Sequence, residues 1–120
     1  KTNDTYGHLV GDVILKAMAR IMRESVREID LISRYGGEEF AICLPETGKA
    51  GAALVAERIR KKIEENTFRA YDESLKLTVS IGVSACPEDS ANPADIIGSA
   101  DAALYAAKKS GKNIVSEYKG

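Results

Sequence analysis

Apolar side chains recur every three or four residues between positions 10 and 26, which predicts a helix with one buried face. The same spacing returns over residues 49–65, where Thr47 is in position to cap the helix. A third helix is predicted to open at Asn92–Pro93 and to end near Gly111, because proline suits a first helical turn and glycine suits the residue after a last one.

Shorter apolar runs predict strands between these helices. Runs at residues 31–32 and 40–44 flank Gly36–Gly37, which predicts a hairpin with a glycine turn. Residues 75–84 alternate between apolar and polar side chains, as in one strand with one buried face. An irregular polar loop is expected before that strand, and residues 113–118 are predicted to form the last one.

The predicted order is helix, strand, strand, helix, strand, helix, strand, and no segment has the composition of a linker. This order predicts a single mixed α/β (α+β) domain over residues 1–120. Two strands joined by a hairpin between two helices also indicate a split βαβ arrangement of the ferredoxin-like kind. In that arrangement a strand precedes the first helix, and we expect it to be absent from this chain.

Composition narrows the class of protein. A chain of 120 residues with 44% hydrophobic residues is large enough to bury a core without disulfides. The net charge of -1 argues against an extended nucleic-acid surface. Cys43 and Cys86 are far apart and lack metal-site spacing, so we expect reduced core residues of a cytosolic protein. The apolar runs are too short to span a bilayer.

Residues 34–40 read RYGGEEF, which places two adjacent carboxylates, Glu38 and Glu39, at the predicted hairpin turn. Neighbouring negative charges are tolerable where divalent cations bind, since carboxylate oxygens are ligands that Mg²⁺ prefers. The glycines before them, Gly36 and Gly37, permit positive φ and close approach of a ligand to the backbone. The alternative is a solvated hairpin tip with no ligand.

Four segments together resemble the GGDEF family of diguanylate cyclases, in the order and at the spacing of that family. They are NDTYGHLVGD (3–12), RYGGEEF (34–40), TVSIGVS (78–84) and ADAALYAAKKSGKN (100–113). The resemblance implies an antiparallel sheet with packed helices, like the palm of nucleotidyl cyclases, with GGEEF on a hairpin turn. It also implies condensation of two GTP molecules into cyclic di-GMP, with release of pyrophosphate, by two domains that face each other in a homodimer.

The resemblance further implies a role for each residue of the acidic turn. Glu38 would bind the metal, Mg²⁺ or Mn²⁺, and Glu39 would assist the metal or the attacking hydroxyl. Gly36 and Gly37 would let the nucleotide approach the turn. The setting implied is cytoplasmic, with an upstream sensory domain and possible membrane anchoring through the rest of a larger protein.

Four further residues match substrate contacts of the family. Asn3 and Asp12 would read guanine, although a turn residue and a first-turn helix acid are the alternatives. Lys108 and Lys112 would bind phosphates, although lysines also favour a helix C-terminus through the dipole alone. Lys112 stands where the family usually has arginine. Packing or hydrogen bonding near the helix start is expected for His8, and packing roles are expected for Tyr35, Phe40 and Tyr105.

A second site is implied by the RxxD segment of Arg27 and Asp30, where many members of the family bind product and are inhibited. Arg58 matches a further basic residue of that site. The planar fork of arginine suits guanine edges and phosphates. The alternative is a surface ion pair of Arg27 and Asp30 that contributes little.

One part of the family pattern lies before Lys1. The strand expected there carries an aspartate that completes the metal site, so we expect the 120-residue chain by itself to be an N-terminally truncated, inactive domain of an active parent. Two other functions stay open: a catalytically inactive sensor module that binds GTP or cyclic di-GMP, and a structural dimerisation unit.

Overall fold

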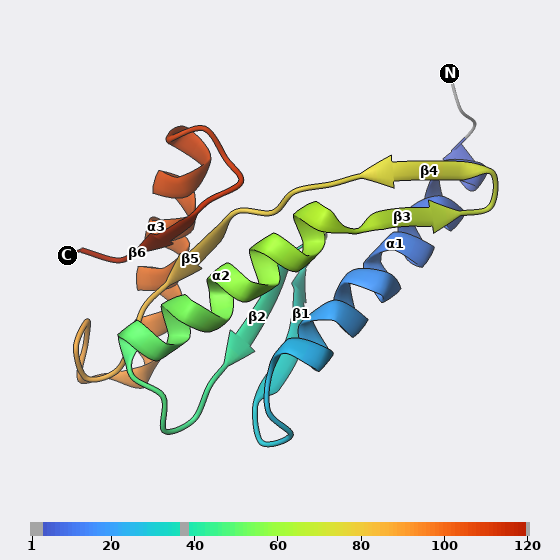
Figure 1. The fold of residues 1–120 in the computed structure, drawn as a ribbon. Coiled ribbons are helices and arrows are strands. Elements are labelled where there is room, and N and C mark those ends of the chain that lie inside the picture. Colours follow the sequence, from blue (N-terminus) through green and yellow to red (C-terminus); the bar gives the residue numbers. More distant parts are fainter. Residues whose placement is uncertain (1–3, 37–38, 120) are drawn as a thin grey trace.

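The computed structural model describes residues 4–36 and 39–119. Along the chain its elements are α1 (Asp4–Ser25), β1 (Leu31–Gly36), β2 (Glu39–Cys43), α2 (Lys49–Glu65), β3 (Thr67–Ala70), β4 (Glu73–Lys76), β5 (Ile81–Val83), the 3-10 turn η1 (Pro93–Asp95), α3 (Ile96–Lys109) and β6 (Val115–Glu117). Figure 1 shows their arrangement. The predicted mixed α/β class is confirmed. Antiparallel pairing holds for β1–β2 and β3–β4, whereas β5 and β6 pair in parallel.

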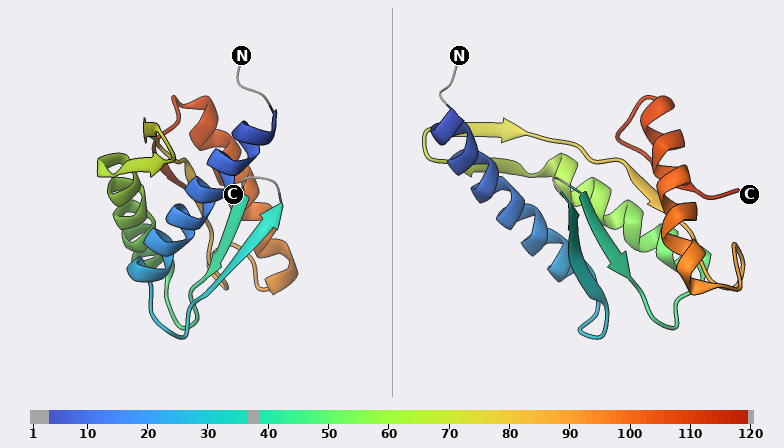
Figure 2. Two further views of the ribbon diagram at one scale, coloured as in Figure 1. Left: turned by 90° about the vertical axis from the view of Figure 1, so that its right-hand side faces the viewer. Right: turned by 180° about the vertical axis from the view of Figure 1, so that it is seen from behind.

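The main apolar core lies where α1, α2 and β3 meet. Met22, Ile59, Ile63 and Phe68 are buried there, at 6% exposure or less. In Figures 1 and 2, α1 and α2 lie on one side of the β1–β2 hairpin, and partly buried side chains of the hairpin, including Phe40, pack against this core. The packing role predicted for Phe40 is confirmed, and the hairpin is thereby held against both helices.

The helices follow the predicted periodicity with differences at their ends. The bounds of α2 agree with the prediction, but its N-cap is Gly48 and no side chain caps it, so the cap predicted at Thr47 is wrong. The Thr47 hydroxyl donates instead to the Pro45 carbonyl, at 3.2 Å. The first helix begins at Asp4, earlier than predicted, because residues 4–9 continue the helix without an apolar stripe to announce it.

Residues 75–84 form parts of two separate strands, which corrects the single strand predicted there. Part of this segment belongs to β4, which pairs with β3, whereas β5 pairs with β6. The predicted irregular loop contains β3, in which Phe68 and Ala70 are buried and their neighbours exposed. A strand of four residues is too short for alternation to identify it, and alternation never names the partner strand.

The last helix lies directly on β5. A Cβ atom at Gly82 would lie 2.2 Å from the Ala100 carbonyl oxygen and 2.4 Å from the Leu104 nitrogen, so the helix backbone occupies the space of a side chain. Ala103 and Ala107 are buried on α3. Glycine in the strand and alanine in the helix therefore permit this close packing, which fixes the position of α3 on β5.

The predictions for five side chains are wrong or fall outside what is described. Cys43 and Cys86 are free, as expected, but both are exposed and neither belongs to the core. Tyr105 is 64% exposed, and its ring lies 5.2 Å from the Lys109 ammonium, so it makes a cation–π contact on the surface. The side chains of His8 and Tyr35 lie outside the described set.

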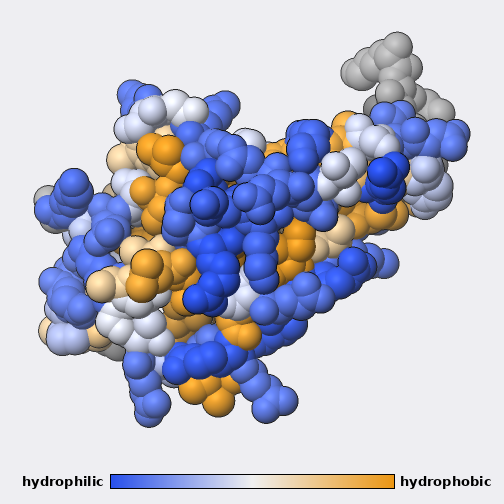
Figure 3. Space-filling view, in the orientation of Figure 1, coloured by the Kyte–Doolittle hydropathy of each residue, from blue (hydrophilic) through white to orange (hydrophobic). Residues whose placement is uncertain are grey.

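Hydrophilic residues cover much of the face seen in Figure 3, where α2 presents exposed lysines and glutamates. Within residues 4–36 and 39–119, no helix has the length and apolar character that crossing a membrane requires.

Candidate functional site

The RYGGEEF segment forms the predicted hairpin. Gly36 pairs with Glu39, and a register shift between Arg34 and Gly36 interrupts the ladder just before the turn. Such bulges bend and twist a strand and re-aim its end. Glu39 is exposed at the start of β2, whereas Gly37 and Glu38 lie outside the described residues. The structure therefore places one of the two predicted metal-binding carboxylates in solvent beside the turn.

The predicted phosphate contacts lie at the C-terminal end of α3. Lys108 is in the last turn and Lys112 follows Gly111, and both lysines are exposed. Gly111 has φ of 118° and the Lys112 N–H donates to the Ala107 carbonyl at 3.1 Å, which is the glycine-terminated helix end that the sequence predicts. In Figures 1 and 2, α3 and β1 both run upward, so their C-terminal ends lie toward the same side of the molecule.

The predicted guanine contacts lie on or before α1. Asp12 is exposed and well inside the helix that begins at Asp4, so the alternative of a first-turn acid is wrong. A mid-helix carboxylate gains little from the helix dipole. Asn3 lies outside the described residues.

At the opposite end of the hairpin, Arg27 and Asp30 form a tight pair in the turn between α1 and β1. The Arg27 Nη2 atom lies 2.9 Å from Asp30 Oδ1, and the Arg27 backbone N–H donates to Asp30 Oδ2 at 2.7 Å. The hydrogen bond from the Arg27 side chain holds the pKa of Asp30 below its usual value, and the same bond raises the pKa of Arg27. Asp30 is only 2% exposed, so one partner of this pair is withdrawn from the surface.

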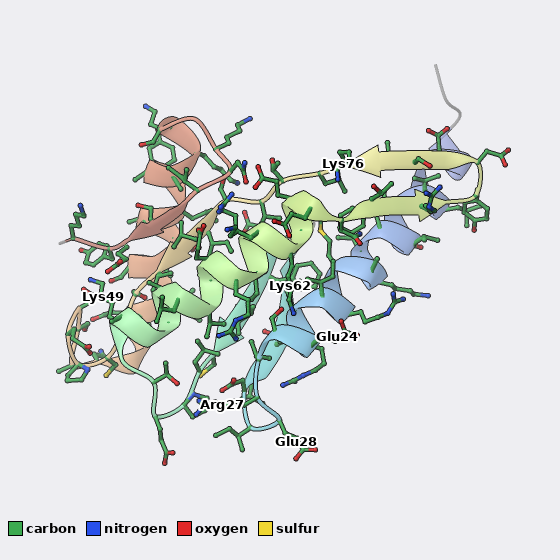
Figure 4. The ribbon with its side chains drawn as sticks, viewed as in Figure 1. Glu24, Arg27, Glu28, Lys49, Lys62 and Lys76 are labelled. Atoms are coloured by element: carbon green, nitrogen blue, oxygen red, sulfur yellow. The ribbon has the colours of Figure 1, made fainter. Side chains whose placement is uncertain are left out.

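Arg27 also joins two turns that are distant in sequence. Its Nη2 atom donates to the Pro45 carbonyl at 2.6 Å and to the Thr47 hydroxyl at 2.9 Å. Figure 4 shows Arg27 between the turn after α1 and the turn that leads into α2. From α2, Arg58 Nη1 donates to the Ser25 carbonyl at 2.9 Å. The guanidinium of Arg27 is thus held in place by the β2–α2 turn as well as by Asp30.

These residues surround a hollow of about 480 Å³. Its lining comprises Glu24, Ser25, Val26, Arg27, Asp30, Leu44, Thr47, Gly51, Val55 and Arg58. The structure therefore brings together the three residues predicted for the product site. Thr47 and the Pro45 carbonyl were missed as members of this cluster, because a hydroxyl assigned to a cap and a backbone oxygen carry no sequence signal for it.

The two candidate sites are joined by β1. Asp30 immediately precedes the strand and Gly36 ends it, so the sites are separated by roughly 20 Å, at about 3.3 Å per strand residue.

The residues that the structure describes supply only part of a set of oxygen ligands for a metal. Among residues 4–36 and 39–119, no three histidine, cysteine, aspartate or glutamate side chains gather as a metal-binding group. The exposed Glu39 carboxylate fits a hard cation such as Mg²⁺, which commonly takes one or two carboxylates and completes its coordination with phosphate oxygens and water. The donor chemistry therefore fits Mg²⁺ at the turn.

Comparisons with known proteins agree with the motifs. The family described as "Diguanylate cyclase, GGDEF domain" matches residues 1–114. Diguanylate cyclase A of Treponema denticola is 43% identical over 114 residues, which cover 95% of this chain and 31% of that protein. Response regulator PleD of Caulobacter vibrioides is 44% identical over 117 residues, which cover 96% of this chain and 26% of that protein. The chain thus spans about a quarter to a third of these relatives.

Solved structures show the same fold. The GGDEF domain of PA1120 from Pseudomonas aeruginosa matches with a TM-score of 0.89 and 32% identity, over 98% of this chain and 74% of that one. The active GGEEF domain of a diguanylate cyclase from Vibrio cholerae matches with a TM-score of 0.84 and 35% identity, over 98% and 74%. The GGDEF domain of DgcB from Caulobacter crescentus, solved in complex with c-di-GMP, also has a TM-score of 0.84, with 32% identity over 98% and 70%.

The fold and the hairpin together define a domain of the nucleotidyl cyclase class. With the family match over nearly all of its length, this chain belongs to the GGDEF family of diguanylate cyclases.

Proposed function

We propose that this domain takes part in the condensation of two GTP molecules into cyclic di-GMP, with release of pyrophosphate, as one half of a homodimer. The observation that carries this proposal is the complete GGEEF motif on a hairpin turn in a chain of the GGDEF family. Each domain would hold one GTP, so two copies must face each other for both bonds of the ring to form. The activity belongs to the protein that contains this domain, in the cytoplasm where GTP is available.

The acidic turn would hold Mg²⁺ or Mn²⁺ through Glu38 and Glu39. Such a cation, when bound, neutralises phosphate charge and favours deprotonation of the attacking 3'-hydroxyl. Gly36 and Gly37, which lack side chains, leave the backbone open to the nucleotide. Exposure of Glu39 beside the turn supports this assignment, since a ligand must reach it from solvent.

The remaining substrate contacts would come from the C-terminal end of α3 and from α1 with the residues before it. Lys108 and Lys112 would bind phosphate oxygens, and lysine at position 112 supplies a point charge without the bidentate fork of arginine. Asp12 would accept hydrogen bonds from the guanine N1 and N2 donors, and Asn3 would both donate and accept at the base edge. The exposed positions of Asp12, Lys108 and Lys112 support these roles.

We also propose that the hollow around Arg27 binds cyclic di-GMP and inhibits the enzyme. Arg27 and Arg58 line it, and the buried Asp30 carboxylate would accept from guanine donors once Arg27 turns from it to the product. Bound product would engage the Arg27 guanidinium, which joins the turn after α1 to the β2–α2 turn through the Pro45 carbonyl and the Thr47 hydroxyl.

Two relatives are described in terms of regulation. PleD is named as a response regulator, and diguanylate cyclase SiaD of Pseudomonas aeruginosa was solved in complex with its activator SiaC. We infer that the present domain is likewise controlled by an attached sensory domain or a bound partner.

The test of catalysis is a turnover assay with GTP and Mg²⁺, on this chain and on the natural protein that contains it. Product formation that is lost in Glu39→Gln but kept in the matched control Glu73→Gln, an exposed glutamate on β4, supports the enzyme. Binding of GTP or cyclic di-GMP without product in either protein favours the sensor module. Absence of nucleotide binding refutes both.

The test of inhibition is turnover with added cyclic di-GMP. Arg27→Ala should lose inhibition and keep turnover, because the residue lies at the far end of β1 from the glycine turn. Arg69→Ala, on the β3–β4 hairpin, is the matched control and should remain inhibited. Unchanged inhibition of Arg27→Ala would refute the assignment.

A further inference from the structure

A second polar cluster lies on α2, away from the hollow around Arg27. The Arg60 guanidinium donates to Glu57 from Nε at 2.8 Å and from Nη2 at 2.6 Å, and to Glu64 from Nη1 at 3.2 Å. The Arg60 side chain is 13% exposed, whereas those of Glu57 and Glu64 are 46% and 44% exposed. Two carboxylates of the same helix therefore fix the Arg60 guanidinium, and one N–H of its Nη1 atom remains for a contact outside α2.

That N–H reaches the loop that follows α3. Arg60 Nη1 donates to Asn113 Oδ1 at 3.0 Å, and Asn113 Nδ2 donates to Glu64 Oε2 at 2.8 Å. The Asn113 backbone N–H donates to the Ser80 hydroxyl at 3.0 Å. The Asn113 side chain is thus held by α2 and its backbone by the segment before β5. Both the oxygen and the nitrogen of its side-chain amide are hydrogen-bonded.

The backbone at this loop has an unusual conformation. Lys112 has φ of 63° and Asn113 has φ of 52°, so two consecutive residues that carry Cβ atoms are left-handed. The left-handed region is disfavoured for side chains with a Cβ, and asparagine tolerates it better than lysine does. Tertiary contacts must hold such a pair. The contacts with Arg60, Glu64 and Ser80 are made by Asn113, which follows the exposed Lys112.

Lys112 is constrained on its other side as well. Its N–H bonds to the end of α3, which Gly82 lets lie directly on β5. The backbone is therefore fixed on both sides of Lys112, although the lysine side chain is exposed. A fixed backbone direction is what a flexible lysine needs if it is to meet phosphates at a set place, since less conformational freedom is then lost on binding.

We propose that Asn113, held by Arg60, Glu64 and Ser80, is a positioning residue that aims Lys112 at the phosphates of the bound nucleotide. This inference rests on the proposed GTP site and deepens it. The cluster would also compensate in part for lysine at position 112, because a point charge without a planar fork has no geometric preference of its own.

The test is a double-mutant cycle on GTP affinity, measured by calorimetry with the whole chain and Mg²⁺. Lys112→Ala should weaken GTP binding about tenfold, as expected for loss of one charge-assisted contact. Asn113→Gly accepts the left-handed backbone but removes the side chain. It should weaken GTP binding about fivefold, because Lys112 keeps its charge but loses its fixed backbone direction. In the Lys112→Ala background, Asn113→Gly should have little further effect, because the residue acts through Lys112.

Three comparisons keep a structural effect apart from positioning. Asn92→Gly is the matched control, since Asn92 also bonds loop backbone, at Ala94, and should keep wild-type GTP affinity. Asn113→Asp keeps the preference for a left-handed backbone and an acceptor for Arg60, but it sets a carboxylate against Glu64 in place of a donor, so its loss should approach that of Asn113→Gly. In turnover assays of the natural protein, the change should fall on KM for GTP and leave kcat within about twofold.

The outcomes separate the inference from the function on which it rests. Failure of the wild-type chain to bind GTP refutes the proposed substrate site and this inference together. GTP binding that weakens in Lys112→Ala but not in either Asn113 variant refutes positioning and leaves the substrate site intact. Positioning is equally refuted if Lys112→Ala has no effect, or if Asn113→Gly costs as much without Lys112 as with it.

Discussion

Substitution of Gly82 by alanine tests how α3 is held on β5. The added Cβ would lie 2.2 Å from the Ala100 carbonyl oxygen, 2.4 Å from the Leu104 nitrogen and 2.9 Å from the Leu104 Cα. All three are backbone atoms, which cannot turn away as a flexible side chain can. The helix must therefore move by about 1 Å to restore ordinary van der Waals contact, at roughly the spacing of close-packed interiors.

The expected cost follows from that displacement. Overpacking a core costs about 1–3 kcal/mol, and a clash with two helical backbone positions belongs at the upper end, at about 3 kcal/mol. Alanine restricts the unfolded chain more than glycine does, which stabilises the folded state by only about 0.5–1 kcal/mol and does not offset the clash. A domain of this size is stable by about 5–15 kcal/mol, so Gly82→Ala should remain folded but be clearly weaker.

Urea denaturation followed by circular dichroism measures this change. Gly98→Ala is the matched control, because Gly98 lies inside α3 with nothing within 4 Å of an added Cβ. It should gain about 0.5–1 kcal/mol, the usual difference between alanine and glycine within a helix. Equal unfolding free energies for Gly82→Ala and wild type, or a loss in Gly98→Ala as large as in Gly82→Ala, would refute this account of the packing.

The remaining predictions concern the core, a buried carboxylate and the thiols. Phe68 is 1% exposed, so Phe68→Ala should lower the free energy of unfolding by about 3–5 kcal/mol in the same assay; a loss below about 1 kcal/mol contradicts the described core. Lys49 Nζ lies 2.7 Å from Asp89 Oδ1, and its hydrogen bond lowers the pKa of Asp89 below the ordinary 3.8. The stability contributed is therefore full above that value and is lost as pH falls through the lowered pKa. Urea midpoints from about pH 6 to pH 2 should fall less steeply below about pH 4 in Asp89→Asn than in wild type, and identical slopes exclude the effect. Both exposed thiols, Cys43 and Cys86, should react with an alkylating reagent in the folded protein, as mass spectrometry would show; protection until unfolding contradicts their placement.

Local patterns predicted the parts of this fold that depend on neighbours in sequence. The apolar spacing of residues 49–65 marked α2 with its bounds, because one helix face had to be buried. Gly111 marked the end of α3, since glycine readily adopts the positive φ found there. The glycine pair between two apolar runs located the hairpin and, with the acidic doublet, the candidate metal site.

Other features were decided by tertiary contacts. The alternation over residues 75–84 indicated burial but was silent on pairing, so it did not reveal that β4 and β5 belong to different sheets. The exposure of Cys43 follows from its place opposite Leu31 at the open end of the hairpin, not from the hydrophobic character of a thiol. Local composition is therefore a poor guide to the burial of a small apolar residue near the end of a strand.

For the candidate sites the same division holds. The sequence by itself determined which residue types are available: the acidic turn, the basic end of α3 and the RxxD segment. Only the folded chain decided that Arg27 bonds to the β2–α2 turn and that Arg60 and Glu64 hold Asn113. The physical reason is that periodicity reports the side of an element that is buried, whereas hydrogen bonds between distant segments depend on where those elements pack in space.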